Sequence, residues 1–140
     1  QRAAVASLTN HEQGSAAAIE VETWLLGEWF GMRPEAPRLV TVPEAELARL
    51  AGTYEYPLAR IRVEPVTGGL WLRAVQTRGL SRQPRERALP PLFLRPIGPA
   101  VFTSGPVRVI PNRVDFVFED GATRPRWIRA FGRLAERTSD

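Results

Sequence analysis

Hydrophobic and polar positions divide the 140-residue chain into two parts with different periods. At the start, Gln1–Asn10 contains a compact apolar run, Ala3–Leu8, which is typical of a strand buried on both faces. Ala16–Phe30 then carries apolar residues around most of a helix, with Gly14–Ser15 as an N-cap and Gly31 as a C-cap. The first part therefore predicts a strand followed by a helix that needs burial over most of its surface.

The composition changes between Met32 and Pro43, where three prolines lie among charged residues. Proline fixes its own φ and lacks a backbone donor, so this spacing favours an extended linker. We therefore predict a boundary here and three segments: residues 1–31, the linker 32–43, and a second domain over residues 44–137.

From Glu44 onward the chain consists of short segments separated by glycine and proline. A helical turn over Glu44–Leu50 precedes Gly52, and Gly68-Gly69 forms a turn between two strands. The expected strands are Thr53–Tyr56, Ile61–Val66, Leu70–Gln76, Leu92–Leu94, Val101–Thr103, Val107–Ile110, Val114–Phe118 and Trp127–Leu134. Glu136–Asp140 is expected to fray. This pattern predicts a mainly β fold, either a sandwich or a small antiparallel barrel, and a glycine inside the last strand favours the barrel.

Composition narrows the functional classes. The hydrophobic content of 44% is enough for a packed core. The net charge is +4 although the pI is about 10.8, because every basic residue other than the single histidine is arginine. The high pI therefore does not indicate nucleic-acid binding. A chain rich in arginine, proline and alanine fits a GC-rich bacterial coding sequence.

The chain contains no cysteine, which excludes disulfides, thiolate metal sites and cysteine nucleophiles but does not decide the compartment. No apolar run has the length of a membrane span. The N-terminus lacks the pattern of a signal peptide. If the chain is part of a longer protein that is exported to the periplasm or beyond, we expect the signal peptide of that protein to lie upstream of Gln1.

Two groups of residues are candidate binding sites. An arginine-rich loop over Thr77–Pro91 could bind phosphate, an anionic polymer or the carboxylates of a partner; the alternative is a solvated loop. Because no aromatic residue is interleaved, nucleic acid is the weaker ligand. The arginines of this loop are Arg78, Arg82, Arg85 and Arg87. A set of aromatic residues could line a cavity for an apolar ligand or fill the core. They are Trp71, Phe93, Phe102, Phe116, Phe118 and Trp127.

Other candidates for chemistry have simpler interpretations. His11 is the single histidine, and Ser7 lies four residues earlier on a predicted strand, too far along it for contact. Glu119 and Asp120 precede Gly121, where an acidic residue stabilises a turn. We therefore expect no metal, no cofactor and no catalytic residue in the chain.

Two sets of motifs resemble one family. Val5–Asn10, with the apolar helix through Trp24-Leu25-Leu26, is similar to the late strand and terminal helix of serine hydrolases of the β-lactamase and penicillin-binding-protein superfamily. Leu50–Glu55, with Gly69–Leu72 and Phe118–Gly121 downstream, resembles the lipocalin-like C-terminal domain that such enzymes often carry. The resemblance covers most of the chain and implies an eight-stranded barrel over roughly 44–137.

The resemblance implies an accessory role. Catalysis in that superfamily uses a Ser-x-x-Lys motif, and the chain has no lysine. We therefore expect a non-catalytic domain that shapes access to the active site of its parent hydrolase or drives self-association, with the hydrolase domain of the same chain or a second copy as partner. The alternatives are a free-standing carrier of a small apolar ligand and, less favoured, an anion-binding or nucleic-acid-binding module.

Overall fold

The computed structural model describes residues 4, 6–8, 10, 14–32, 37–77, 86–104 and 113–139. The chain forms two compact units, Gln1–Ala36 and Pro37–Asp140. Within the described residues, the first unit contains one helix and the second contains one helix and nine strands.

The first unit is built on α1 (Gly14–Phe30). The predicted helix is confirmed and begins two residues earlier than expected. It ends at Gly31, whose φ of 66° is accessible to glycine at little cost. The predicted strand is wrong for the described part of Gln1–Asn10, because Ala6–Leu8 has no regular structure. A strand needs a hydrogen-bonding neighbour, and no described residue of this unit supplies one.

The second unit begins with α2 and continues as a series of short strands. Their bounds are α2 (Glu44–Leu50), β1 (Gly52–Tyr56), β2 (Ala59–Val66), β3 (Gly69–Gln76), β4 (Arg87–Ala88), β5 (Leu92–Gly98), β6 (Val101–Thr103), β7 (Arg113–Val117), β8 (Trp127–Ala130) and β9 (Arg133–Ser139).

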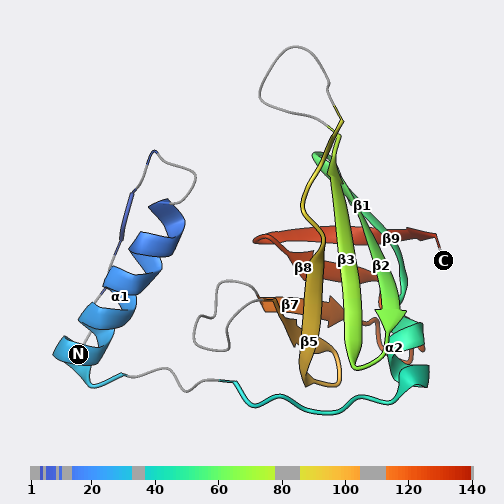
Figure 1. Cartoon of the computed structure of the whole chain (residues 1–140), viewed down its shortest axis with the longest axis horizontal. Helices are drawn as coiled ribbons and strands as arrows, with labels where there is room; N and C mark the ends of the chain where they lie inside the picture. Colours follow the sequence, from blue (N-terminus) through green and yellow to red (C-terminus); the bar gives the residue numbers. More distant parts are fainter. Residues whose placement is uncertain are drawn as a thin grey trace. The chain divides into compact units, whose positions relative to one another are not determined.

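Eight of these strands form a closed antiparallel barrel (Figure 1). Each strand from β1 to β9 pairs with the next in the chain, except that β4 and β5 both pair with β3 and not with each other. The barrel closes because β9 pairs with β1. The predicted mainly β fold with an eight-stranded barrel is therefore confirmed.

β4 is a short additional strand on β3. Leu89 still donates a backbone hydrogen bond to the Ala74 carbonyl (2.8 Å). Pro90 and Pro91 follow and cannot donate, so the ladder on β3 is interrupted before β5 resumes it. The two prolines therefore interrupt the segment that pairs with β3, so that it forms two separate strands, β4 and β5.

Alternating residues fill the interior of the barrel. The side chains of Tyr54, Ile61, Leu70, Leu94 and Ile128 are fully buried, as the two-residue period of a strand requires. Two edge-to-face ring contacts cross the core: Phe116 lies 6.0 Å from Tyr54 and 5.6 Å from Phe102, centroid to centroid.

One end of the barrel is covered by α2, which lies beside the β2–β3 turn at the lower end in Figure 1. Leu47 and Leu50 of this helix are buried in the core cluster. The helix therefore packs against the core through two leucines that lie three residues apart.

Arg137 of β9 joins the end of α2 to the barrel wall. Its guanidinium donates hydrogen bonds to the carbonyls of Arg49 and Ala51 and to the Tyr54 hydroxyl, and lies 5.6 Å from the Tyr54 ring centroid. Tyr54 in turn donates to the Leu50 carbonyl (2.7 Å). A helix end leaves its last carbonyls without partners, so these bonds stabilise both the helix and the closure of the barrel.

Gly52 makes this arrangement sterically feasible. Its φ is 148°. A Cβ at this position would lie 2.8 Å from the Ser139 carbonyl oxygen and 2.9 Å from Arg137 Cζ. The β1–β9 seam therefore needs a residue without a side chain at Gly52.

Four sequence predictions need correction or lie outside the described residues. Trp127–Leu134 is not one strand but a hairpin of β8 and β9 that turns at Phe131-Gly132. The segment Glu136–Ser139 does not fray, since it belongs to β9 and closes the barrel. The predicted strand Leu92–Leu94 is longer than expected, since β5 continues through Pro96 to Gly98. The predicted strand Val107–Ile110 lies outside the described residues.

Candidate functional site

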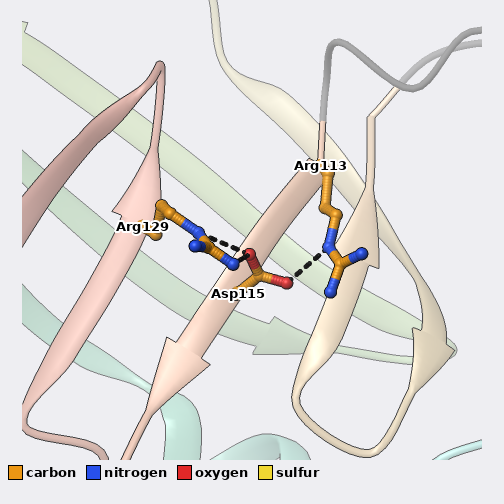
Figure 2. A network of polar contacts seen from close by, with 3 residues as sticks. All are labelled: Arg113, Asp115 and Arg129. Carbon is orange, nitrogen blue, oxygen red and sulfur yellow. Dashed lines mark hydrogen bonds and ion pairs between the residues drawn. The ribbon is translucent and has the colours of Figure 1, made fainter. Parts of the chain in front are cut away.

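The outer wall of β7 and β8 holds a carboxylate between two guanidiniums (Figure 2). Arg113 Nε donates to Asp115 Oδ1 (2.6 Å), and Arg129 Nε donates to Asp115 Oδ2 (2.7 Å). Arg129 Nη2 donates a second bond to Oδ2. We call these three residues the Asp115 cluster.

The strand register brings the cluster together. Asp115 lies directly opposite Arg129 on β8, and Arg113 precedes Asp115 by two residues and so shares its face of β7. The Asp115 side chain is 9% exposed, whereas those of Arg113 and Arg129 are 52% and 59% exposed. The carboxylate is therefore buried beneath two arginines that still face solvent.

Electrostatics keep this carboxyl ionised. Burial alone would raise the pKa of Asp115, but hydrogen bonds and positive charge from Arg113 and Arg129 outweigh it and lower the pKa below its ordinary value. A buried carboxylate with two charge-assisted partners is well satisfied. The cluster therefore fixes both guanidiniums in place, and one of the two positive charges remains uncompensated.

Apolar side chains surround the cluster on β7, β8 and β9. Leu134 lies directly opposite Arg129 and is 54% exposed. Val117 pairs with Trp127 in the next row of the same face. Phe131, in the turn between β8 and β9, is 48% exposed. We call this set, with the Asp115 cluster, the β7–β9 surface.

A second ionic group borders this surface. The Arg126 guanidinium lies 4.6 Å from the Trp127 ring centroid and pairs with Glu119 and Glu136. The two carboxylates raise the pKa of Arg126, so it stays charged. Cation–π stacking of this kind holds Trp127 against the wall.

The structure divides the predicted aromatic set between the interior and the outer wall. Phe102 and Phe116 are buried in the core, and Phe118 packs against it. Trp71 and Phe93 face outward as a cross-strand pair, with ring centroids 5.4 Å apart. Trp127 also faces outward, against Arg126. The six aromatic residues therefore do not line a single cavity.

A groove of about 350 Å³ lies between α2 and the β2–β3 turn. Leu47, Pro65 and Val66 form its apolar part, and Glu44 and Thr67 add polar groups. It lies next to the helix that covers one end of the barrel and shares Leu47 with the core cluster. It brings together none of the residues that the sequence singled out.

The predicted arginine loop falls mainly outside the described residues, which include Arg87 but not Arg78, Arg82 or Arg85. Arg87 is exposed on β4. His11 is also outside the described part of the chain. Asp120 lies in the expected turn, and Glu119 pairs with Arg126.

The tryptophans are the most exposed of the large hydrophobic side chains described on α1. Trp24 is 60% exposed and Trp29 is 67% exposed, and Val21 is also exposed. These are the residues for which the sequence predicted burial. Neither described helix is long and apolar enough to cross a membrane.

Sequence reasoning did not identify the β7–β9 surface. Arg113, Asp115 and Arg129 form no local motif, since one arginine is fourteen residues from the aspartate. Only the pairing of β7 with β8 joins them.

The chain matches no model of a known protein family, and no curated protein matches it.

Proposed function

We propose that the chain is a non-catalytic accessory portion of a serine hydrolase of the β-lactamase superfamily. On this proposal the catalytic residues lie upstream of Gln1, and the barrel modulates access to the active site or self-association of the enzyme. The resemblance of Leu50–Glu55 and of Val5–Asn10 to that superfamily supplies the motive for the proposal.

One structural observation supports it most: the barrel interior is occupied by its own side chains, while the Asp115 cluster and the rings of Trp71, Phe93 and Trp127 lie on the outer wall. Tyr54 and Phe102 are each 0% exposed inside the barrel. Interaction chemistry, in contrast, gathers on the β7–β9 surface, where Arg129 and Leu134 are more than half exposed. Such a distribution suits a domain that acts through contact with another protein surface.

α1 is a second support. An apolar helix with exposed tryptophans gains free energy by packing on a further surface. In the proposed parent, Trp24 and Trp29 would be buried by the upstream hydrolase sheet. The free-standing carrier is the less favoured function because the described core side chains fill the interior that a ligand would need.

The first test is the open reading frame upstream of Gln1, which we expect to encode Ser-x-x-Lys. The second compares the intact parent with a variant that lacks residues 44–137. We expect deletion of the barrel to change KM across a series of ester or amide substrates of increasing size, or to change the oligomeric mass measured by light scattering. An inactive variant of the upstream serine serves as the background control.

Two results would contradict the proposal. One is an upstream frame without the serine–lysine motif. The other is a truncated parent with unchanged kinetic constants for every substrate and unchanged mass. Saturable uptake of an apolar dye by the chain alone, with a stoichiometry near one, would instead support the carrier alternative.

A further inference from the structure

The outer wall of β2, β3 and β5 carries an aromatic pair between rows of charged residues. These strands are neighbours in the sheet and lie side by side in Figure 1. Trp71 lies directly opposite Phe93, with an angle of 57° between the rings, and Phe93 is 37% exposed. Because residues of a strand alternate between faces, the outward neighbours of this pair lie two residues away. We call the following six residues the β2–β5 wall: Arg62, Glu64, Trp71, Arg73, Phe93 and Arg95.

Arginines lie on both sides of the aromatic pair. Arg73 is two residues beyond Trp71 on β3, and Arg95 is two residues beyond Phe93 on β5. Since β3 and β5 are antiparallel, these two arginines lie on opposite sides of the pair, about 13 Å apart along the strands. A ligand laid along β3 and β5 would therefore meet one guanidinium, the two rings and then a second guanidinium.

One contact within the wall opposes the stability of the barrel. Arg62 lies directly opposite Arg73, and like charges in that position destabilise a pair of strands. Glu64 compensates for one of the two charges, since the Nε atom of each arginine lies 3.1 Å from a carboxylate oxygen of Glu64. Within the described residues neither guanidinium has a second acidic partner. A bound anion would remove the remaining repulsion.

The charge on this side of the barrel is positive when every outward position of β1 to β6 is counted. Four arginines and two glutamates leave an excess of two positive charges: Arg60, Arg62, Arg73 and Arg95 against Glu55 and Glu64. The adjoining wall of β7 to β9 adds no net charge, because three arginines there pair with three carboxylates. They are Arg113, Arg126 and Arg129 with Asp115, Glu119 and Glu136. The positive excess therefore belongs to the side that displays Trp71 and Phe93.

Rings and positive charge together fit a single-stranded nucleic acid. Each nucleobase offers a flat face that stacks on an aromatic ring, and each phosphate accepts hydrogen bonds from guanidiniums. The ring centroids are 5.4 Å apart, which is wider than the repeat of about 3.4 Å in a duplex, where neighbouring bases also cover each other's faces. An acidic polypeptide or a sulfated polysaccharide has no such faces and would leave the rings without a role.

Strand pairing supplies what the arginine-rich loop over Thr77–Pro91 lacks. That loop has no aromatic residue among its arginines, which made nucleic acid the weaker ligand in sequence terms. On the β2–β5 wall, Trp71 lies next to Arg73 and Phe93 next to Arg95 on the same outward face. The interleaving is therefore a property of the sheet and not of any local motif.

We propose that the β2–β5 wall binds single-stranded nucleic acid without sequence preference. Two consecutive bases stack on Trp71 and Phe93, and the adjacent phosphates pair with Arg73 and Arg62 on one side and with Arg95 on the other. This inference does not rest on the proposed function, since it involves neither the barrel interior nor the β7–β9 surface.

The test is fluorescence titration of the 140-residue chain with oligothymidine of about ten nucleotides. We expect saturable binding that quenches tryptophan emission. The logarithm of the association constant should fall linearly with the logarithm of the salt concentration, with a slope of about −2, because about three phosphates each contribute about 0.7. A duplex of the same length should bind at least about tenfold more weakly, because its bases cannot reach the rings.

Aromatic variants locate the stacked bases. Trp71→Phe keeps a ring, so it should bind within about threefold of the native chain but lose most of the quenching. Trp127→Phe is the matched control on the outer face of β8 and should retain both affinity and quenching. Trp71→Leu together with Phe93→Leu should weaken binding by at least about tenfold. Because the ring pair also stabilises the strands, thermal midpoints are recorded for every variant.

Arginine variants locate the phosphates. Arg62→Gln together with Arg73→Gln should make the salt slope less steep by about 1.4. These substitutions also remove the like-charge contact, so the barrel should remain folded. Arg133→Gln, at an exposed position of β9, is the matched control and should leave the slope unchanged.

Several results would overturn the proposal. One is no saturable binding at about 50 mM salt. Another is binding that is abolished by Arg82→Gln together with Arg85→Gln but unaffected by the variants of the wall, which would assign it to the loop. A third is equal affinity for polyglutamate or heparin that does not change in Trp71→Leu with Phe93→Leu, which would show a surface that attracts any polyanion.

Discussion

Four glycines of the barrel allow the contribution of backbone strain to be separated from that of steric overlap. At Gly98 neither problem exists: an added Cβ would lie 3.5 Å from Val101 and φ is not positive. At Gly68 the φ is 80° but nothing lies within 4 Å. At Gly69 a Cβ would lie 2.3 Å from the Leu94 carbonyl oxygen. Gly52 combines a φ of 148° with close contacts.

The glycine-to-alanine substitutions should therefore form a graded series of stabilities. Gly98→Ala should change the free energy of unfolding by less than about 1 kcal/mol, and in the stabilising direction, since alanine restricts the unfolded chain. Gly68→Ala should cost about 1 kcal/mol, because strain of about 1–2 kcal/mol exceeds that gain. Gly69→Ala should cost about 1–3 kcal/mol or more from overpacking against strand backbone.

Gly52→Ala should be the most destabilising of the four, at about 3–5 kcal/mol, since strain and overpacking act together. The Ser139 carbonyl belongs to the β1–β9 seam, and the Arg137 guanidinium is held by the helix-end carbonyls, so neither can move away freely. For a domain of ordinary stability, about 5–15 kcal/mol, this is a large fraction of the total.

The assay is urea unfolding at 25 °C, followed by circular dichroism of the strands, with a common slope for all variants. If Gly52→Ala costs no more than Gly68→Ala, the contacts at the seam are not limiting and the account of barrel closure is wrong. If Gly98→Ala is as destabilising as the others, the substitutions perturb the strands through some effect other than strain or overlap.

Two further predictions concern ionisation. Because the pKa of Asp115 is lowered in the folded state, its contribution to stability should be present above the ordinary pKa of about 3.8 and lost as the pH falls through the folded value. Asp115→Asn should cost about 1–3 kcal/mol at pH 7 and less at pH 3 by urea unfolding; an equal loss at both pH values would show that the charge is not responsible. Burial raises the pKa of Tyr54 to about 12, although Arg137 opposes this shift. The neutral phenol therefore stabilises the fold below pH 10, and this stability should be lost as the pH rises from 10 to 12. Tyr54→Phe should flatten that part of the unfolding profile, and identical alkaline profiles for the two proteins would contradict the prediction.

The barrel was predictable from sequence because its interior positions follow the two-residue period of a strand. Ile61, Val63, Leu70 and Leu72 alternate with polar or outward-facing residues, so the pattern alone places them inside. The number of strands at the C-terminal end was not predictable in the same way. The turn at Phe131-Gly132 has the usual glycine in its second position but a phenylalanine in its first, and the hydrophobic alternation continues on both sides of it.

The candidate site was beyond sequence reasoning for a different reason. The Asp115 cluster exists only because β7 and β8 pair with Asp115 opposite Arg129. A shift of one residue would turn the aspartate toward the core. The outward aromatic pair of Trp71 and Phe93 shows the same limit: composition identified both rings, but only the register decides which face of the wall they occupy.

Because β9 pairs with β1, the barrel cannot close until its last strand has been synthesised. β1 emerges from the ribosome roughly 80 residues before β9; at about 5–20 residues per second, it stays without its final neighbour for about 4–16 s. During that interval the backbone donors and acceptors on one side of β1 are open to any other extended segment. The nascent barrel therefore has an unpaired strand edge at β1 until its last strand arrives.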